Sequence, residues 1–385
     1  MNFEEKIDRY SRRPIKVNFL SLKKFILKRK PFIVDQYLKN LEELFLLRNP
    51  QYRFNKDYRE SFDLFKKRHF TKKSLSEAGC WFYFPWSNTL VHFLSHNLHQ
   101  ELRTGRNLYL VNREEQEKYY NAKIGILGMS VGSHVALTIV MTGGSRHIKI
   151  ADPDLISGDN LNRVRTGFQS VGTNKAIAVA RQIYEINPYS RVDAYTKGIT
   201  EENIVRFLHG LDIIVEEMDN PYLKIKVRSL ARKIGIPVIM AADNGDGIIV
   251  DVERYDLSRN YPILHGLIGK MKAEDLKNLP SRDLPKVIAK IAGADIADLR
   301  MLHSVTEVGK SIYSWPQLGT AATLCGSILS YLSRRIILKD KKIQSGRYEI
   351  NPDTVFEKDF NSSKEKKKRE SRRKIFLKLI GLGSV

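Results

Sequence analysis

The chain has 385 residues and a net charge of +22, so it is long enough for one large domain or two and favours attraction to polyanions. It contains two cysteines, Cys80 and Cys325, which excludes a disulfide framework and a multi-cysteine zinc site. No apolar run approaches the ~20 residues of a membrane span, and the first residues lack the apolar stretch of a signal peptide. We therefore expect a cytoplasmic protein with no membrane span.

Residues 1–100 form the first predicted region, and the spacing of their apolar side chains predicts helices. Apolar residues recur at intervals of three and four: Tyr37, Leu38, Leu41, Leu44 and Phe45. The aromatic run 79–86 is interpreted as a core cluster, with a stacking platform for a base as the alternative. Cys80 in this run has no neighbouring base and is expected to act as a small buried hydrophobe.

Three histidines, His92, His96 and His99, fall at spacings that would put them on one face of a helix. They could bind a metal, but few acids or cysteines lie near them. A solvated or core-edge row is therefore the favoured interpretation. Two arginines follow, Arg103 and Arg106, and they could reach the γ-phosphate of a nucleotide in the same or a partner subunit. A plain surface role is equally open for both.

The stretch 123–163 shows the order strand, glycine turn, helix, strand, acid. The strands are predicted at 123–127 and 148–151, with a glycine turn at 128–132 between them. Glycines let a backbone approach phosphates, and a helix that starts there offers free N–H groups. Asp152 lies twenty residues after Gly132, near the offset expected for an acid that binds a ribose hydroxyl. The turn does not spell G-x-G-x-x-G, so a plain strand-to-helix connection remains the alternative.

Further strands and helices alternate after this unit, which predicts a mainly parallel, doubly wound Rossmann-like α/β sheet with helices on both faces. The predicted strands are 192–196, 213–216, 237–241 and an outer strand at 247–254, and the predicted helices are 175–186, 201–209 and 222–235. Polar side chains follow the strand ends: Asp152, Asn162, Arg163 and Asp219. Because ligands of such sheets bind beyond the carboxyl ends of the strands, these residues are expected to converge on one ligand. Polar loops with no shared ligand are the alternative.

The last part of the chain has weaker secondary-structure signals. Residues 255–313 read as helical, and 320–338 as a small-residue helix at a core or an interface, with Cys325 inert. Residues 341–385 form a basic tail that is predicted to be disordered. Both basic ends of the chain could attract nucleic acid or an anionic surface, although solvated charged ends are the simpler interpretation.

At this point the motifs resemble a known family. The run GILGMSVGS, ADPD, DNLNR, GTNKA and EEMDN is similar to the adenylation domain of the ThiF/MoeB/ubiquitin-activating enzyme family. The resemblance covers about 102–254 and is weaker in the helix after Gly319. Residues 101–340 are therefore assigned to this domain. The N-terminal part resembles a bacterial subgroup in which the domain is often fused to a nitroreductase-like domain.

The resemblance implies a role for each motif residue. Asp152 would bind the ribose of ATP, while Asn162, Arg163 and Lys175 would hold its phosphates and Asp219 would hold Mg²⁺. The remaining positions of the implied nucleotide site are Gly128, Ser130, Gly132, Asp154 and Asn160. Arg103 or Arg106 would reach the triphosphate of a partner subunit, which implies a homodimer.

The chain also departs from the family pattern. The paired CxxC zinc site is absent, so no zinc is expected, and no cysteine lies between Asp243 and Gly319, where an acyl-capturing cysteine is expected. Thioester formation is therefore not expected. The hypothesis is an ATP- and Mg²⁺-dependent adenylyltransferase that activates the carboxylate of a small protein, a peptide or a small acid. Two alternatives remain: an NAD(P)- or flavin-linked redox component, and a non-catalytic nucleotide-binding or nucleic-acid scaffold.

Overall fold

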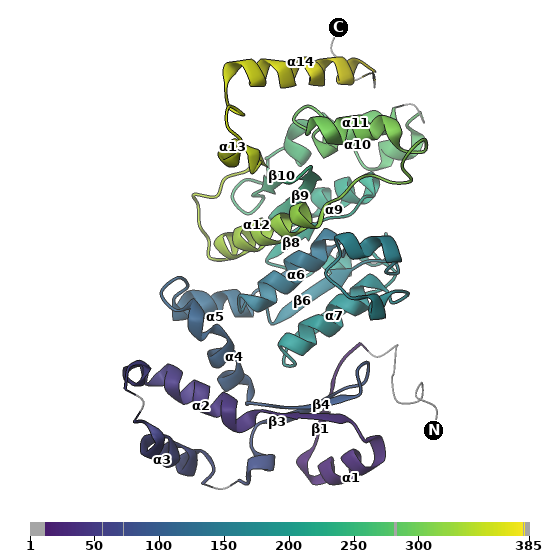
Figure 1. Ribbon diagram of the computed structural model, residues 1–385. Helices are drawn as coiled ribbons and strands as arrows, with labels where there is room; N and C mark the ends of the chain where they lie inside the picture. The colour runs from purple at the N-terminus through teal and green to yellow at the C-terminus, as the bar shows by residue number, and fades with distance from the viewer. Residues whose placement is uncertain (1–11, 56, 72, 281–282, 380, 382–385) are drawn as a thin grey trace. The chain divides into compact units, whose positions relative to one another are not determined.

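The structure is a computed structural model that describes residues 12–55, 57–71, 73–280, 283–379 and 381 (Figure 1). The chain divides into two compact units, and each is described by itself. The first unit contains the chain up to Tyr120 with 140–144 and 180–190, and the second contains 121–139, 145–179 and the chain from Arg191 onward. The segment between residue 100 and Tyr120, which the sequence analysis assigned to the adenylation domain, groups with the first unit.

The first unit contains helices and a four-stranded sheet of order β1-β3-β4-β2. Its elements are β1 (Ile15–Val17), α1 (Phe19–Arg29), β2 (Phe32–Asp35), α2 (Tyr37–Arg48), α3 (Arg59–His69), β3 (Cys80–Phe84), β4 (Thr89–Phe93), α4 (His96–Thr104) and α5 (Arg113–Asn121). The expected helices are present, and their apolar stripe, including Leu41 and Leu44, is buried. The sheet corrects the prediction of a purely helical region, because strands of three to five residues are too short for alternation to stand out.

The aromatic run and the histidine row are placed by this sheet. Trp81 and Tyr83 on β3 are buried in a core cluster, in agreement with the core interpretation. The prediction that His92, His96 and His99 share one helix face is wrong, because His92 lies on strand β4 whereas His96 begins α4. The His92 ring is hydrogen-bonded to the Asp35 carboxylate at 3.0 Å and to the Ala78 carbonyl at 2.7 Å, so both of its nitrogens are used inside the unit.

The second unit is built on a seven-stranded sheet of order β11-β10-β9-β8-β5-β6-β7. Its strands are β5 (Lys123–Leu127), β6 (His147–Ala151), β7 (Arg191–Tyr195), β8 (Ile213–Glu216), β9 (Val238–Asn244), β10 (Gly247–Glu253) and β11 (Gly346–Ile350). Strands β5 to β9 run parallel, and β10 pairs antiparallel with both β9 and β11. Strand order reverses between β5 and β8, which is where a doubly wound sheet opens toward a ligand. The predicted sheet is confirmed.

Helices cover both faces of this sheet. The helices described from Val131 onward are α6 (Val131–Met141), α7 (Lys175–Ile186), α8 (Ile204–Leu208), α9 (Pro221–Ile234), α10 (Leu284–Ala292), α11 (Leu299–Glu307), α12 (Gly319–Ile337), α13 (Asp353–Phe356) and α14 (Ser363–Leu379), of which α14 packs on α11. Val227 of α9 packs in one core cluster with Val238 of β9. Cys325 of α12 approaches Asp243 of β9. Val238 and Asp243 are five positions apart, and successive side chains of a strand alternate, so α9 and α12 lie on opposite faces.

The C-terminal region corrects two predictions. Strand β10 is not the outer strand, because β11 pairs along it in register from Ile248–Ile350 to Val252–Gly346. The described part of the basic tail is not disordered, since it supplies β11, α13 and α14, and Phe376 of α14 packs with Leu302 of α11. Composition alone could not reveal these long-range contacts. Among the residues described, no helix combines the length and apolar character that a membrane crossing requires.

A buried ion pair joins β11 to β10. The guanidinium of Arg347 donates from Nε and Nη2 to the two oxygens of Asp251, both at 2.7 Å. His265 lies 3.2 Å from the same carboxylate. Burial alone would raise the pKa of Asp251, but the hydrogen bonds and charges of Arg347 and His265 outweigh it and lower the pKa to about 2.

This pair predicts a specific acid sensitivity. A carboxylate whose pKa is lowered by folding stabilises the protein above its ordinary pKa, and that stability disappears as the pH falls through the folded value. We expect wild type to lose about 1 kcal/mol more than Asp251→Asn between pH 7 and pH 3, and about 2 kcal/mol more down to pH 2. Urea unfolding at each pH measures this difference. The exposed Asp353→Asn should follow wild type, and parallel profiles for wild type and Asp251→Asn would contradict the assignment.

Candidate nucleotide-binding site

The glycine turn lies directly beyond β5. Gly128 has a φ of +84°, and a Cβ there would lie 2.4 Å from the main-chain oxygen of Glu217. Glycine is therefore required, because a side chain would be both strained and obstructed by the backbone after β8. The Gly128 N–H donates to the Ala151 carbonyl at 2.8 Å, and α6 begins at Val131. Gly132 lies in the first turn of α6 against Ile126 and Met129.

Asp152, at the end of β6, closes this turn. It is 4% exposed, and its Oδ2 accepts from the Met129 N–H at 2.6 Å while Oδ1 accepts from the Asp154 N–H at 2.8 Å. Burial raises the pKa of Asp152, and these main-chain donors and Lys175 offset part of the rise. The Asp152 carboxylate therefore lies beside the glycine turn, the position expected for an acid that binds a ribose hydroxyl.

Lys175 is held next to Asp152. It begins α7, and its Nζ lies 3.0 Å from Oδ2 of Asp154. The preceding Asn174 donates from Nδ2 to the carbonyls of Asp152 and Asp154, at 2.9 and 3.1 Å. Sequence reasoning missed Asn174, although its position next to the predicted lysine was a signal. These contacts bring Gly128, Asp152, Asp154 and Lys175 together at one edge of the sheet.

A second group of contacts is formed by the loop after β6. Arg163 donates from Nη1 to the Asp159 carbonyl at 3.1 Å and to Oδ1 of Asn162 at 2.9 Å. His134 of α6 is hydrogen-bonded to the Arg163 carbonyl at 2.7 Å, which ties the loop to the glycine-turn helix. Asn160 is 5% exposed, and its side chain helps to cap the 3₁₀ turn Gly158–Asn162 in which it lies. It therefore stabilises the conformation of the loop.

Two buried polar atoms near this edge have no hydrogen-bond partner in the described part of the chain. They are Oγ of Ser130, in the glycine turn, and Nε of Arg163. An unpaired buried donor is costly, so such atoms indicate a missing acceptor. Phosphate oxygens are strong acceptors, and the start of a helix favours anions. The residues present therefore fit the phosphates of a nucleotide.

A group of residues that sequence reasoning missed lies beyond β8 and β9. Glu217 accepts from the Ala241 N–H at 2.9 Å, and Asp243 accepts from Nε2 of Gln317 at 3.2 Å. The Gln317 carbonyl in turn accepts from Nδ2 of Asn162 at 2.8 Å, which links this group to the Arg163 loop. Burial raises the pKa of both Glu217 and Asp243. Glu217 lies two residues before the predicted metal ligand Asp219, and this short distance in sequence was a signal for it.

Asp219 is exposed in the loop after β8. The Met218 N–H donates to Oε1 of Glu216 at 2.8 Å and so shapes the loop, while Asn220 caps α9. Among the described residues, no group of three or more His, Cys, Asp or Glu side chains could hold a metal ion. A single carboxylate such as Asp219 would hold Mg²⁺ only together with the phosphates of a bound nucleotide, as in sites where one or two carboxylates and the substrate phosphates share the ion.

The two upstream arginines lie in the first unit and differ in exposure. Arg103 donates from Nη1 to the Val140 carbonyl and from Nε to Oε1 of Gln100, at 2.7 Å for the latter. Burial lowers the pKa of Arg103 to about 10. Arg106 is exposed. Nη2 of Arg103 is buried without a hydrogen-bond partner among the described residues, so Arg106 differs from Arg103 in being exposed.

This chain is similar to known proteins over most of its length. Residues 104–372 match the model of the ThiF family. The uncharacterized protein MT1398 of Mycobacterium tuberculosis is 36% identical over 278 residues, which are 72% of this chain and 38% of that protein. The sulfur carrier protein adenylyltransferase of Thermus thermophilus is 26% identical over 160 residues, which are 41% of this chain and 57% of that protein.

Among solved structures, the tRNA N6-threonylcarbamoyladenosine dehydratase TcdA of E. coli is 17% identical, with a TM-score of 0.46. That alignment covers 63% of this chain and 97% of the TcdA chain. The chain spans 38% and 57% of the lengths of the two sequence relatives named above. Because the family match covers well over half of the sequence, the chain belongs to the ThiF family.

Proposed function

We propose that this chain is an ATP- and Mg²⁺-dependent adenylyltransferase that activates a carboxylate as an acyl-adenylate. The observation that carries the proposal is the pair of unpartnered buried atoms, Ser130 Oγ and Arg163 Nε, at the edge that also holds Lys175. Both family membership and the sulfur carrier adenylyltransferase among its relatives support the same class of reaction.

In the proposed reaction, a carboxylate oxygen forms a bond to the α-phosphorus of ATP, and the bond from that phosphorus to its bridging oxygen breaks. Pyrophosphate leaves with the bonding electrons. Lys175 and Arg163 bind the phosphates and neutralise the charge that develops on them. Asp219 would hold Mg²⁺, which would supply further charge neutralisation when bound. No protein nucleophile takes part.

The proposed product is the adenylate rather than a thioester. Cys325 is fully buried, and burial raises the pKa of its thiol, with the nearby acids Glu217 and Asp243 adding to the effect. A buried thiol beside carboxyl groups is a poor nucleophile because little thiolate forms. The proposed carboxylate belongs to the C-terminus of a small protein or peptide, or to a small acid. The proposal includes a cytoplasmic homodimer in which Arg106 reaches the triphosphate of the partner subunit.

ATP–pyrophosphate exchange tests this function. We expect exchange that requires a matching carboxylate and magnesium, that stops with chelator, and that falls in Asp219→Ala because the metal loses its protein ligand. A panel of peptides with free C-terminal carboxylates, set against the same peptides as C-terminal amides, supplies the matched control. ATP binding with no exchange for any carboxylate would favour the non-catalytic scaffold, and unchanged exchange in Asp219→Ala would contradict the metal role.

A further inference from the structure

A row of basic side chains crosses the amino ends of three neighbouring strands. The register of β5, β6 and β7 places Lys123 beside His147 and His147 beside Arg191. Neighbouring strands lie about 4.8 Å apart, so the row spans about 10 Å. Like charges on adjacent strands are unfavourable unless an opposite charge lies near. The next row along the same face supplies one, Asp193, which pairs with both His147 and Arg191.

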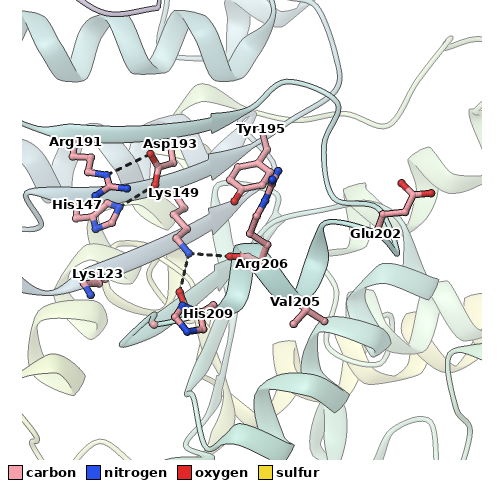
Figure 2. Close-up of a pocket in the computed structure, with 11 residues that line it drawn as sticks. Lys123, His147, Lys149, Arg191, Asp193, Tyr195, Glu202, Val205, Arg206 and His209 are labelled. Atoms are coloured by element: carbon pink, nitrogen blue, oxygen red, sulfur yellow. Dashed lines mark hydrogen bonds and ion pairs between the residues drawn. The ribbon is translucent and has the colours of Figure 1, made fainter.

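This face of the sheet is polar where a parallel sheet is normally apolar. Sheets of this kind bury both faces under helices, and their strands are usually apolar throughout. On β6 and β7, however, the face that bears His147, Lys149, Arg191 and Asp193 is covered by α8, which has only five residues. A cavity of about 710 Å³ remains over the strands, as Figure 2 shows with its lining side chains. Small-molecule sites commonly have volumes of ~300–1,000 Å³.

Lys149 lies among the charged groups that line the cavity. Lys149 is 8% exposed, and its Nζ donates to the carbonyls of Arg206 and His209 at 3.1 and 2.8 Å, as Figure 2 shows. It also donates to the Phe207 carbonyl at 2.9 Å, so these bonds fix α8 to the sheet. Burial lowers the pKa of Lys149, and the charges of Lys123, Arg191 and Arg206 lower it further, whereas Asp193 opposes them. Three cations and one acid therefore lie close enough to act on this ammonium.

We propose that this cavity binds a phosphate-bearing small molecule at a site separate from the nucleotide edge. Four lysine and arginine side chains line it, Lys123, Lys149, Arg191 and Arg206, against two acids, Asp193 and Glu202. Lys149 is hydrogen-bonded to main-chain carbonyls in and just after α8, and Arg191 pairs with Asp193. Lys123 and Arg206 are therefore the cations whose charge a ligand would neutralise. The Arg206 guanidinium lies 5.6 Å from the centre of the Tyr195 ring, which holds it at the cavity. A compact ligand with several negative oxygens matches this arrangement.

The proposed site and the nucleotide edge lie at opposite ends of the same strands. Gly128 and Asp152 follow the carboxyl ends of β5 and β6, whereas Lys123 and His147 begin those strands. Five residues of strand separate the ends by roughly 15 Å. The two sites can therefore be tested independently, and the accessory site does not depend on the proposed adenylation.

Calorimetric titration of the full chain with inorganic tripolyphosphate at low ionic strength tests the proposal. Lys123→Ala and Arg206→Ala should each weaken binding about tenfold, because each removes one charge-assisted contact to the anion. Lys123 and Arg206 are exposed, so neither substitution disturbs the core. Lys270→Ala removes an exposed charge outside the cavity lining and should bind as wild type does. Thermal unfolding of each variant verifies its fold.

A further variant distinguishes tripolyphosphate binding at the two ends of the sheet. Lys175→Ala should remove any tripolyphosphate that binds at the nucleotide edge and leave the Lys123- and Arg206-sensitive binding intact. Wild-type affinity in both Lys123→Ala and Arg206→Ala would overturn the proposal. An equal loss in Lys270→Ala would also overturn it, since the protein would then attract the anion only through its overall charge.

Discussion

Replacing Arg228 with methionine should lower the free energy of unfolding by about 3–5 kcal/mol. Arg228 of α9 is fully buried between two acids that are themselves fully buried, Glu216 at the end of β8 and Glu253 at the end of β10. Both ion pairs measure 2.5 Å. Without the guanidinium, two carboxyl groups would remain in the core without their main counter-charge. Each would have to stay ionised at a high desolvation cost or bind a proton.

Urea unfolding followed by circular dichroism measures this loss. Lys233→Met, on the exposed side of the same helix, removes the same charge and should stay within about 0.5 kcal/mol of wild type. A triple variant of Arg228→Met with Glu216→Gln and Glu253→Gln removes the charges together and should regain stability over the single variant. A single variant within 1 kcal/mol of wild type, or a triple variant no more stable than the single one, would show that the network contributes little.

The same network shapes the candidate site. Glu216 accepts from Nη1 of Arg228 and from the Met218 N–H, so the acid that anchors α9 also orients the loop that carries Asp219. Lys224 adds a contact to Glu216 at 3.2 Å. The position of the proposed magnesium ligand therefore depends on a core ion pair, and the Arg228 variant should disturb this loop as well as stability.

The sheet could be predicted because its signals are local. Short β-rich runs, the glycine turn and the acid after β6 lie within about thirty residues of one another, and the predicted strand at 213–216 coincides with β8. The charged network could not be predicted in this way. Glu216 and Glu253 lie 12 and 25 residues from Arg228, and in a sequence such charges look like a solvated helix face.

The candidate site likewise combines contacts that a local sequence pattern can predict with contacts that it cannot. Asp152 contacts the glycine turn and Lys175 contacts Asp154, because strand ends in a parallel sheet share one edge. The convergence of Asp152, Asn162, Arg163 and Asp219 on one ligand stays a prediction. Gln317 lies 74 residues from Asp243 and 155 from Asn162, so no local pattern could join them. The tail was misjudged for the same reason, since a basic run resembles disorder until the 96-residue contact from Arg347 to Asp251 is known.

Arg163→Ala should reduce ATP–pyrophosphate exchange by about 10²–10³-fold, which is the usual effect of removing one fixed group that stabilises transition-state charge. Arg163 is expected to act in two ways. Its unpartnered Nε is available to a phosphate oxygen, and its Nη1 fixes the loop through the Asp159 carbonyl and Asn162. Arg163→Lys separates these effects, because lysine keeps the charge but loses the planar fork that makes both contacts.

The neighbouring Arg165→Ala is the matched control, because it removes an exposed guanidinium from the same loop. We expect it to keep most of the exchange rate, while ATP affinity measured separately divides any loss in Arg163→Ala between binding and chemistry. Exchange at the wild-type rate in Arg163→Ala would remove the residue from the site. Equal losses in both variants would mean that the loop acts only through its total charge, in which case the unpartnered Nε must have another role.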